Sequence, residues 1–387
     1  MKALLITTGY LPYTFSECLC NAKLVYALQK NGWEVDVISR SDDGLSYSRE
    51  WNEPWLCLRQ NTYEITYPLG NSFSRFCDLI RSTIVMGSPL EGIRWARRAY
   101  EKAVKLYEEK HYDVIFTRSP SDVPHSVGYK LKKRFGIRWI ANWNDPSETI
   151  WPEPYTHYFP AWKSNMLNRY TVRCLKAADI NTFPSQSLLD HFMAYFPFLR
   201  NQHTAVIPHI TLWDSLYTPA KHVKKGKLYL CHSGNLSLER NPELLFRAMR
   251  EMIDEGCTHI HLDIMGHIND YTQNLIDKYG LAVYVGCTGS YPYMEAMHRM
   301  QDYDVLVLLE ARMKHGVFFA SKFTDYAQVA RPIFAISPVS GFAKDMITKY
   351  GGGIVVDNED YKDIKRGLYD LYRTWESDSL FSSYDTK

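Results

Sequence analysis

The segment around Gly234 combines residue types that suit the binding of a diphosphate. It reads HSGNLSLERNPE and follows an apolar run, so that Ser233-Gly234-Asn235 turns the chain with little side-chain bulk. Arg240 comes next, just before Asn241-Pro242-Glu243, a typical start of a helix. A bare loop, a helix N-terminus and a cation together favour a bound diphosphate. The same residues also fit an ordinary strand-to-helix turn with a surface arginine.

A second segment, HGVFFASKFTDYAQ, offers a cation and a carboxylate on one helix face. Ser321 is a candidate N-cap, and Lys322 and Asp325 are three positions apart. A carboxylate here can accept hydrogen bonds from both hydroxyls of a ribose, and a lysine can reach a phosphate. A surface ion pair between the two residues is the alternative interpretation.

Other nucleotide and metal patterns are missing from the sequence. The loops after the two leading strands, GYLPYTFSE and HSGNLSLERNPE, lack GxGxxG, which disfavours a nicotinamide or flavin enzyme. No GxxxxGK precedes Ser or Thr, and the cysteines show no zinc-finger spacing. No cluster of carboxylates at a strand end suits a metal-bound diphosphate, and the nearest candidates are Asp42 and Asp43. We therefore expect no metal and no cofactor.

The elements that position these residues alternate between strand and helix. Residues 3–8 (ALLITT) and 34–39 (EVDVIS) read as buried strands around a helix at 16–30, which is a βαβ unit. Residues 41–75 read as irregular, and one long helical stretch runs to about residue 110. Strands at 113–117, 139–142 and 180–183 and helices at 123–135 and 160–177 follow.

The second half repeats the alternation more regularly. Strands are expected at 228–231, 260–265, 283–285, 305–309, 332–335 and 354–356, with helices at 242–254, 271–279, 291–300, 322–329 and 341–349. Six strands and five crossovers predict a doubly wound sheet.

The fold class is therefore α/β, with two Rossmann-like doubly wound parallel sheets facing a cleft. We expect an N-terminal domain at 1–215 and a C-terminal domain at 216–387, with a solvated linker at 211–227 that contains KHVKKGK. The last helix is a candidate to pack back on the first domain. Because ligands bind at the carboxyl ends of parallel strands, the site is expected at the cleft.

Composition narrows the class of protein. The 387 residues include 45 Lys and Arg against 43 Asp and Glu, so the net charge of +2 gives no general reason to bind nucleic acid. No stretch is long and apolar enough to span a membrane, and the first residues enter a strand rather than a signal peptide. The eight scattered cysteines indicate reduced thiols in a cytoplasmic protein.

Several motifs in order resemble the retaining GT-B glycosyltransferases of family 4, over essentially the whole chain. They are Gly234-Asn235-Leu236 with Arg240, Ser321-Lys322-Phe323-Thr324-Asp325-Tyr326, Ala330-Arg331-Pro332-Ile333, LKAADINTF, Val206-Ile207-Pro208-His209 and GGGIVVDNED. The resemblance implies transfer of a sugar from a UDP- or GDP-linked donor to a glycan, lipid-linked or small-molecule acceptor, in cell-surface polysaccharide synthesis.

The resemblance also assigns roles. The C-terminal domain would bind the nucleotide sugar, with Arg240, Lys322 and the Ser233-Gly234 amides stabilising the leaving diphosphate without a metal. Asp325 would hold the ribose, and the turn Gly289-Ser290-Tyr291 would lie near the base. Acceptor-side residues in the N-terminal domain would be Arg118, His125 and Asp145, and no protein nucleophile is assigned.

The sequence departs from the family pattern at two places. Many members carry two glutamates eight positions apart; the second matches Asp325, whereas the first falls at Val317. The glycine-rich first loop is reduced to Gly9. These departures leave two alternatives open: a catalytically silent sugar-nucleotide or glycan-binding partner of another transferase, and a sugar-nucleotide 2-epimerase.

A basic, aromatic helix is a candidate for peripheral contact with the inner membrane surface. It contains Arg94-Trp95-Ala96-Arg97-Arg98-Ala99-Tyr100, Lys102 and Lys105. The alternative is a solvated helix face, balanced by Glu91, Glu101, Glu108 and Glu109.

Overall fold

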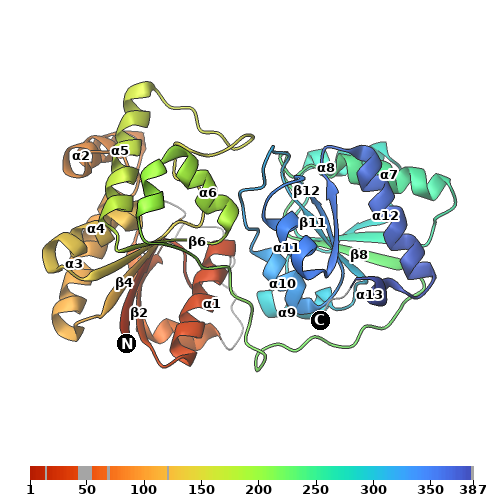
Figure 1. Cartoon of the computed structure of the whole chain (residues 1–387), viewed down its shortest axis with the longest axis horizontal. Coiled ribbons are helices and arrows are strands. Elements are labelled where there is room, and N and C mark those ends of the chain that lie inside the picture. Colours follow the sequence, from red (N-terminus) through yellow and green to blue (C-terminus); the bar gives the residue numbers. More distant parts are fainter. Residues whose placement is uncertain (14, 42–54, 68–69, 120–121, 385–387) are drawn as a thin grey trace. The chain divides into compact units, whose positions relative to one another are not determined.

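The computed structural model describes residues 1–13, 15–41, 55–67, 70–119 and 122–384 (Figure 1). Asp42 and Asp43 lie outside the described residues. The chain divides into two compact units, Met1–Ile210 and Thr211–Lys387. Each unit holds one parallel sheet covered by helices on both faces, which confirms the predicted fold class.

The first unit contains a seven-stranded sheet of order β3-β2-β1-β4-β5-β6-β7. Its pairs are parallel, with Leu4 opposite Asp36 on one side of β1 and Ile115 on the other. The elements, in chain order, are β1 Lys2–Thr7, α1 Ser16–Lys30, β2 Glu34–Ser41, the 3-10 helix η1 Trp55–Asn61, β3 Thr62–Thr66, α2 Ser72–Met86, α3 Ile93–Lys110, β4 Val114–Arg118, α4 Val123–Phe135, β5 Arg138–Asn142, α5 Ala161–Ala177, β6 Ile180–Phe183, α6 Gln186–Tyr195, the 3-10 helix η2 Pro197–Asn201 and β7 Thr204–Val206.

Two expectations for residues 41–110 are wrong. The stretch expected to be irregular contains β3, an edge strand that pairs with β2 through residues such as Tyr63 and is only half-buried, so it lacks the apolar run of a central strand. The single long helix is two helices, because Gly87 and Gly92 both adopt left-handed conformations and Pro89 lies between them.

The second unit contains a six-stranded sheet of order β10-β9-β8-β11-β12-β13, with all pairs parallel, as predicted. Two C-terminal helices, α12 and α13, were not among the expected elements, and the strand expected at 283–285 lies at Val285–Cys287. The elements are β8 Leu228–Ser233, α7 Glu243–Asp254, β9 Ile260–Met265, α8 Asp270–Lys278, β10 Val285–Cys287, α9 Tyr293–Met300, β11 Val305–Leu309, α10 Lys322–Val329, β12 Ile333–Ser337, α11 Phe342–Tyr350, β13 Gly353–Asp357, α12 Tyr361–Glu376 and α13 Leu380–Ser383.

The last two helices belong to the core of the second unit. Leu371 and Trp375 of α12 and Leu380 of α13 pack with the residues of α7 and the sheet. The expected solvated linker at 211–227 is also part of this unit. Tyr217 is buried and donates a hydrogen bond to the Met297 carbonyl, and the Leu212 amide donates to Gln328.

Each sheet has one point where the strand order reverses. In the first unit this point lies between β1 and β4, and in the second between β8 and β11. Open parallel sheets bind ligands outside the carboxyl ends of the strands at such a reversal. Residues just after these four strands are therefore the first to examine.

Candidate functional site

The turn after β8 is tied to helix α10 by a buried tyrosine. The Ser233 amide donates to the Tyr326 hydroxyl at 2.8 Å, and that hydroxyl donates to the Val307 carbonyl of β11. Gly234 has φ +124°, in the region that favours glycine, and its amide donates to the Met265 carbonyl. Tyr326 therefore holds the glycine turn, β11 and α10 in one fixed arrangement.

Lys322 projects from the start of α10 onto this turn. A Cβ added at Gly234 would lie 2.6 Å from the Lys322 Nζ, so the ammonium group lies directly against the glycine turn. Burial and, to a smaller extent, the nearby positive charge of Arg240 lower the pKa of Lys322 to about 7. Neither cation forms an ion pair with any residue that the structure describes. The predicted residues Arg240, Lys322, Ser233 and Gly234 thus come together.

Glu310 is a site residue that the sequence reasoning missed. It follows β11 directly, and burial raises its pKa to about 7 despite the opposing charges of Arg240 and Lys322. The signal was available, because a lone acidic residue follows the apolar run VLVLL at the end of a strand. Val317, at the position of the family's first glutamate, is instead a buried core residue.

His232 lies at the end of β8 and is buried and neutral. Burial lowers its pKa well below the usual value, and the charge of Lys322 adds to the effect. Its Nδ1 is 3.0 Å from the Val307 carbonyl, which can only accept, so Nδ1 carries the proton. The Nε2 atom is then an acceptor, and it has no hydrogen-bond partner among the described residues.

Asp325 lies one turn into α10, within electrostatic reach of Lys322. The Tyr293 hydroxyl of α9 donates to its Oδ1 at 2.6 Å, which orients the carboxylate. Tyr293 is a second residue missed from the sequence. Ser321 stands at the N-cap position of α10, although its side chain makes no capping hydrogen bond.

The remaining predicted residues of the second unit make other contacts. Asn235 accepts a hydrogen bond from the His267 amide, which links two loops at the sheet edge. Gly289 has φ +78° in the exposed turn before α9, and Ser290 is exposed in the same turn. The Tyr291 ring lies 4.0 Å from the Arg299 guanidinium. Within the described ranges, no hydrogen bond or ion pair joins this turn to Lys322 or Arg240.

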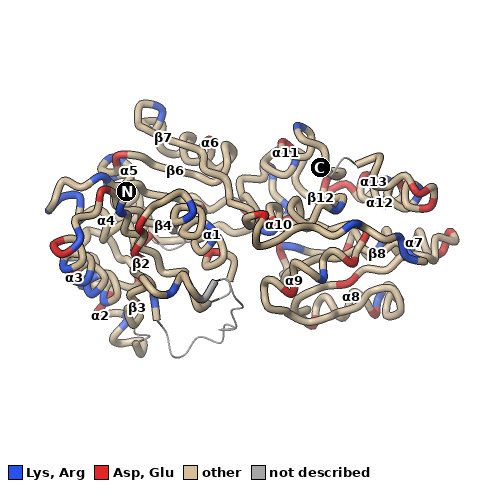
Figure 2. Tube along the Cα trace, turned by 90° about the horizontal axis from the view of Figure 1, so that it is seen from below, with Lys and Arg blue, Asp and Glu red and all other residues tan. Residues whose placement is uncertain are grey.

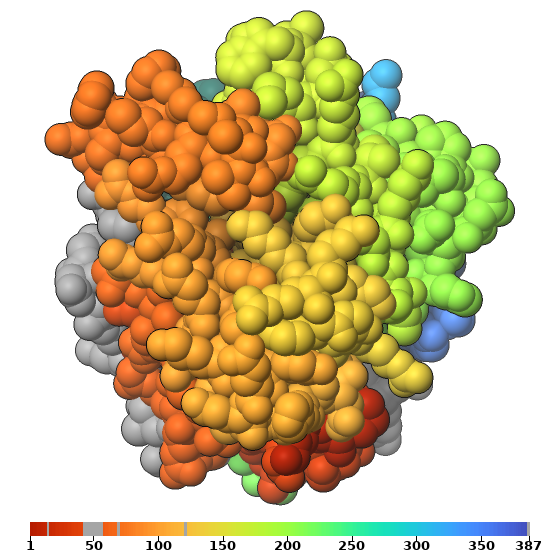
Figure 3. Space-filling view, turned by 90° about the vertical axis from the view of Figure 1, so that its left-hand side faces the viewer, coloured from red at the N-terminus to blue at the C-terminus, as the bar shows by residue number. Residues whose placement is uncertain are grey.

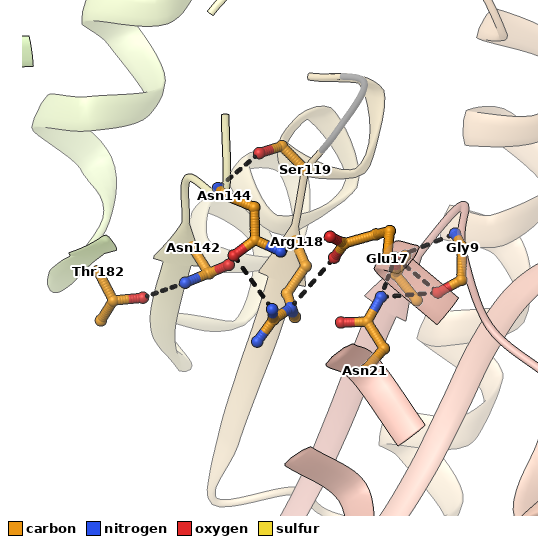
Figure 4. A network of polar contacts seen from close by, with 9 residues as sticks. Gly9, Glu17, Asn21, Arg118, Ser119, Asn142, Asn144 and Thr182 are labelled. Carbon is orange, nitrogen blue, oxygen red and sulfur yellow. Dashed lines mark hydrogen bonds and ion pairs between the residues drawn. The ribbon is translucent and has the colours of Figure 1, made fainter. Parts of the chain in front are cut away.

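The first unit holds a buried polar network where its strand order reverses (Figure 4). Arg118, the last residue of β4, lies 3.5 Å from the carboxylate of Glu17 on α1. Asn144 joins both, donating to Glu17 at 2.6 Å and accepting from Arg118 at 3.1 Å. Arg118 is thus confirmed at a strand end, whereas Glu17 and Asn144 were not anticipated.

This network leaves polar atoms unsatisfied. One Glu17 oxygen, the Arg118 Nε and the Asn142 amide oxygen are buried and have no hydrogen-bond partner within the described residues. Burial raises the pKa of Glu17 to about 7; the Arg118 charge opposes this rise and the Asp145 charge adds to it. Buried polar atoms without partners at a strand-order reversal suit a ligand rich in hydroxyl groups.

The backbone groups of Gly9 are used internally, whereas the buried Nε2 of His125 has no hydrogen-bond partner among the described residues. The Gly9 amide donates to Thr7 and its carbonyl accepts from Asn21 at 2.7 Å, so both backbone groups are used internally. His125 is fully buried, with Nδ1 2.7 Å from the Thr117 hydroxyl and its ring 4.2 Å from that of Trp143. Burial lowers its pKa to about 3.

Family models match consecutive parts of the chain. The model described as Glycosyltransferase Family 4 matches residues 21–210, and the model described as Glycosyl transferases group 1 matches residues 217–387. Together they span nearly the whole sequence, so the chain belongs to the family 4 glycosyltransferases and is an enzyme of that class that uses a nucleotide-sugar donor. No curated protein matches the chain.

Solved structures share the GT-B fold at low sequence identity. Sucrose-phosphate synthase from Thermosynechococcus elongatus has a TM-score of 0.67 at 15% identity, covering 98% of this chain and 92% of its own. Anabaena HepE in complex with UDP and glucose has a TM-score of 0.66 at 15% identity, covering 99% and 94%. Starch synthase IV from Arabidopsis thaliana, bound to ADP and acarbose, has a TM-score of 0.65 at 12% identity, covering 97% and 92%. These similarities confirm the predicted fold.

Proposed function

We propose that the second unit binds a UDP- or GDP-linked sugar and that the enzyme transfers the sugar with retention and without a metal. The observation that carries this proposal is the placement of Arg240 and Lys322 at the Gly234 turn, without a carboxylate partner among the described residues. Two cations that repel each other are stabilised by an anion with at least two charges. The UDP in the HepE complexes makes UDP the first nucleotide to test.

In this proposal the chemistry at the donor is electrostatic. Arg240, Lys322 and the Ser233-Gly234 amides stabilise the charge that develops on the leaving diphosphate. Asp325, oriented by Tyr293, accepts the ribose hydroxyls, and the Gly289-Ser290-Tyr291 turn lies near the base. The retaining outcome rests on the family resemblance.

The first unit is proposed to bind the acceptor at the Glu17–Arg118–Asn144 network. Because Glu17 lies 3.5 Å from Arg118, the cation is compensated internally and adds little net charge. The network therefore suits the neutral hydroxyls of a glycan better than a phosphate. The acceptor in this proposal is a glycan or a lipid-linked sugar. The enzyme would then act in the cytoplasm, in the synthesis of a cell-surface polysaccharide.

Calorimetric titration with UDP and GDP tests the donor site. Arg240→Ala should weaken binding of the preferred nucleotide by about 1.5–3 kcal/mol, the range for a hydrogen bond to a charged group. Arg250→Ala on α7 is the matched control, because Arg250 pairs on the surface with Asp254. Unchanged affinity in Arg240→Ala would remove this residue from the site.

Release of free nucleotide distinguishes the transferase from the silent binding partner. Acceptor-dependent release of UDP or GDP that continues in EDTA is the expected result. A complete loss in EDTA that manganese restores would contradict the metal-free chemistry. Nucleotide binding without any turnover across a panel of acceptors would favour the silent partner instead.

A further inference from the structure

Helix α2 turns its apolar face to solvent. Phe73, Phe76, Ile80 and Ile84 have exposed fractions of 76%, 61%, 46% and 78%, and their spacing of three or four residues places them in one stripe along the helix. Val85, exposed by 55%, widens the stripe at its C-terminal end. Such a continuous patch is unusual on a monomeric protein, in which large apolar side chains normally face the core.

The opposite face of α2 is anchored to the first unit by the buried Met86, which belongs to the hydrophobic core, and by polar contacts. Ser82 is fully buried and donates to the Ser88 carbonyl at 2.7 Å, while the Leu90 amide donates to Ser82. Asp78 pairs with Arg94 of α3 at 2.8 Å. These bonds would break if the helix rotated to bury its phenylalanines, so the apolar stripe is a fixed surface of the first unit.

A cationic groove borders the stripe. It is lined by Arg81, Val85, Ile93, Arg94, Arg97, Arg98 and Lys130, from α2, α3 and α4. Arg94 and Arg97 are paired with Asp78 and Glu101, whereas Arg81 and Arg98 form no ion pair with any residue in the described ranges. Figure 2 shows cationic residues grouped along α3, and Figure 3 shows the orange surface of α2 projecting above α3 and α4 on the same face.

We propose that the α2 stripe and its arginine border form an interfacial surface that docks the first unit on an anionic lipid bilayer. The apolar side chains enter the boundary between headgroups and acyl chains, and Arg81 and Arg98 contact the anionic headgroups. No helix in the described part of the chain is long and apolar enough to cross a membrane, so this contact is peripheral. The surface is separate from the donor site and does not rest on the proposed function.

This surface replaces the membrane helix expected from the sequence. In α3 the tryptophan that suggested an interfacial helix, Trp95, is fully buried and donates to the Ser39 carbonyl. The α3 helix therefore contributes arginines only, and α2 supplies the apolar contact. A second copy of the chain fits the same surface less well, because a two-fold contact would place two arginine-bordered surfaces of the same charge against each other.

Vesicle flotation with the full-length protein tests the apolar part. Wild type should bind vesicles of phosphatidylcholine mixed with phosphatidylserine, and Ile84→Asp should lower the partition coefficient at least about tenfold. Val283→Asp in the second unit is the matched control, because Val283 is exposed by 74%. An unchanged circular dichroism spectrum and unchanged UDP affinity would confirm that Ile84→Asp leaves the fold and the donor site intact.

Charge reversal tests the lipid class. Arg81→Glu and Arg98→Glu should each reduce binding to the phosphatidylserine vesicles by about fivefold or more and should lose this effect on phosphatidylcholine alone. Lys344→Glu, an exposed lysine on α11, should change nothing. The proposal would be overturned if wild type does not float with either vesicle, or if Ile84→Asp binds as wild type does. It would also be overturned if the stripe instead drives self-association, seen as a dimer that Ile84→Asp converts to a monomer.

Discussion

The two units place cations at corresponding points of their sheets but treat them differently. Arg118 in the first unit follows the reversal of strand order and lies beside Glu17 and Asn144. Arg240 and Lys322 in the second unit lie beside the equivalent reversal without an ion-pair partner among the described residues. The same architecture thus holds one cation beside a buried carboxylate and two cations that have no ion-pair partner among the described residues.

The difference has opposite consequences for stability and binding. Removing one partner of a buried ion pair strongly destabilises the folded state, because the remaining charge is left buried without a counter-charge. Two like charges instead destabilise each other, and the resulting repulsion is relieved when an anionic ligand binds. The cation of the first unit should therefore matter for folding, and those of the second unit for ligand affinity.

The largest expected effect is on the stability of the first unit. Arg118→Met leaves Glu17 without its counter-charge and should lower the free energy of unfolding by about 3–5 kcal/mol at pH 8. Burial raises the folded-state pKa of Glu17 to about 7, above its value of about 4.3 in an unfolded chain. The folded state therefore favours the neutral acid, so stability is retained at low pH and lost as the pH rises through about 7.

Urea denaturation at pH 5 and pH 8 measures this effect, and the loss should be smaller at pH 5. Arg134→Met is the control, because the Arg134–Glu108 pair is exposed and should be worth less than about 1 kcal/mol. An equal loss at both pH values would show that Glu17 is not the group left unpaired.

The corresponding substitution in the second unit should leave stability unchanged and weaken nucleotide binding. Lys322→Met removes a charge that Arg240 repels, so the free energy of unfolding should be maintained or rise slightly. The affinity for UDP or GDP should fall by about 1.5–3 kcal/mol. Thermal denaturation and calorimetry measure the two quantities, with Lys349→Met on exposed α11 as the control. A destabilised variant with normal nucleotide affinity would reverse the comparison.

Substitution of Asp325 on α10 distinguishes a contact with the donor ribose from a surface ion pair. Asp325→Asn should raise the donor KM by an amount equivalent to about 1–3 kcal/mol and leave the fold intact, whereas Asp325→Glu should be tolerated better. Tyr293→Phe should cause a smaller rise, because its hydroxyl only orients Asp325. Identical donor kinetics for wild type and Asp325→Asn would exclude a ribose contact.

The smallest effect is the pH dependence of nucleotide binding. Burial lowers the pKa of Lys322 to about 7 and raises that of Glu310 to about 7, and a bound diphosphate favours charged Lys322 and neutral Glu310. Binding should therefore take up protons, and affinity should fall above pH 7 by up to about 1.4 kcal/mol per pH unit for each proton.

Calorimetry at pH 7.5 in buffers of different ionisation enthalpy measures the proton uptake. Glu310→Gln should reduce the uptake, and Lys322→Met should reduce it as well, because each removes one titrating group. Proton uptake that neither substitution alters would assign it to the nucleotide phosphate itself.

Much of the fold was predictable because it depends on local patterns. The bounds of α1, α4, β6, β9, β11 and α10 agree with those expected from the sequence. The prediction of one long helix was wrong at Gly87 and Gly92. The helix ends there because the backbone adopts left-handed conformations, which the spacing of hydrophobic residues does not reveal. Edge strand β3 was not predicted, because it is only half-buried and its sequence lacks the apolar run of a central strand.

Residues of the candidate site were predictable only where they belong to a recognisable sequence motif. Arg240, Lys322 and Asp325 follow recognisable turns, whereas Glu17 sits in the first turn of α1 and looks like an ordinary N-terminal acidic residue. Its partner Arg118 is about a hundred residues away in sequence, so no local pattern joins them. The expectation for Trp95 was wrong for a different reason, because an aromatic residue on a basic helix gives no sign in the sequence of complete burial.

The sequence by itself determined the order of strands and helices, the division into two parallel sheets and the family, since periodicity, turn residues and short motifs are local. Only the tertiary structure decided which charges are compensated and which face of α2 meets solvent. These properties depend on what lies across the fold: Glu17 beside Arg118, Glu310 near Lys322, and Asp78 bound to Arg94 so that the phenylalanines of α2 point outward. Burial and Coulomb energy depend on distances that chain folding creates, and for that reason an arginine lies beside a carboxylate in one unit and has no ion-pair partner among the described residues in the other.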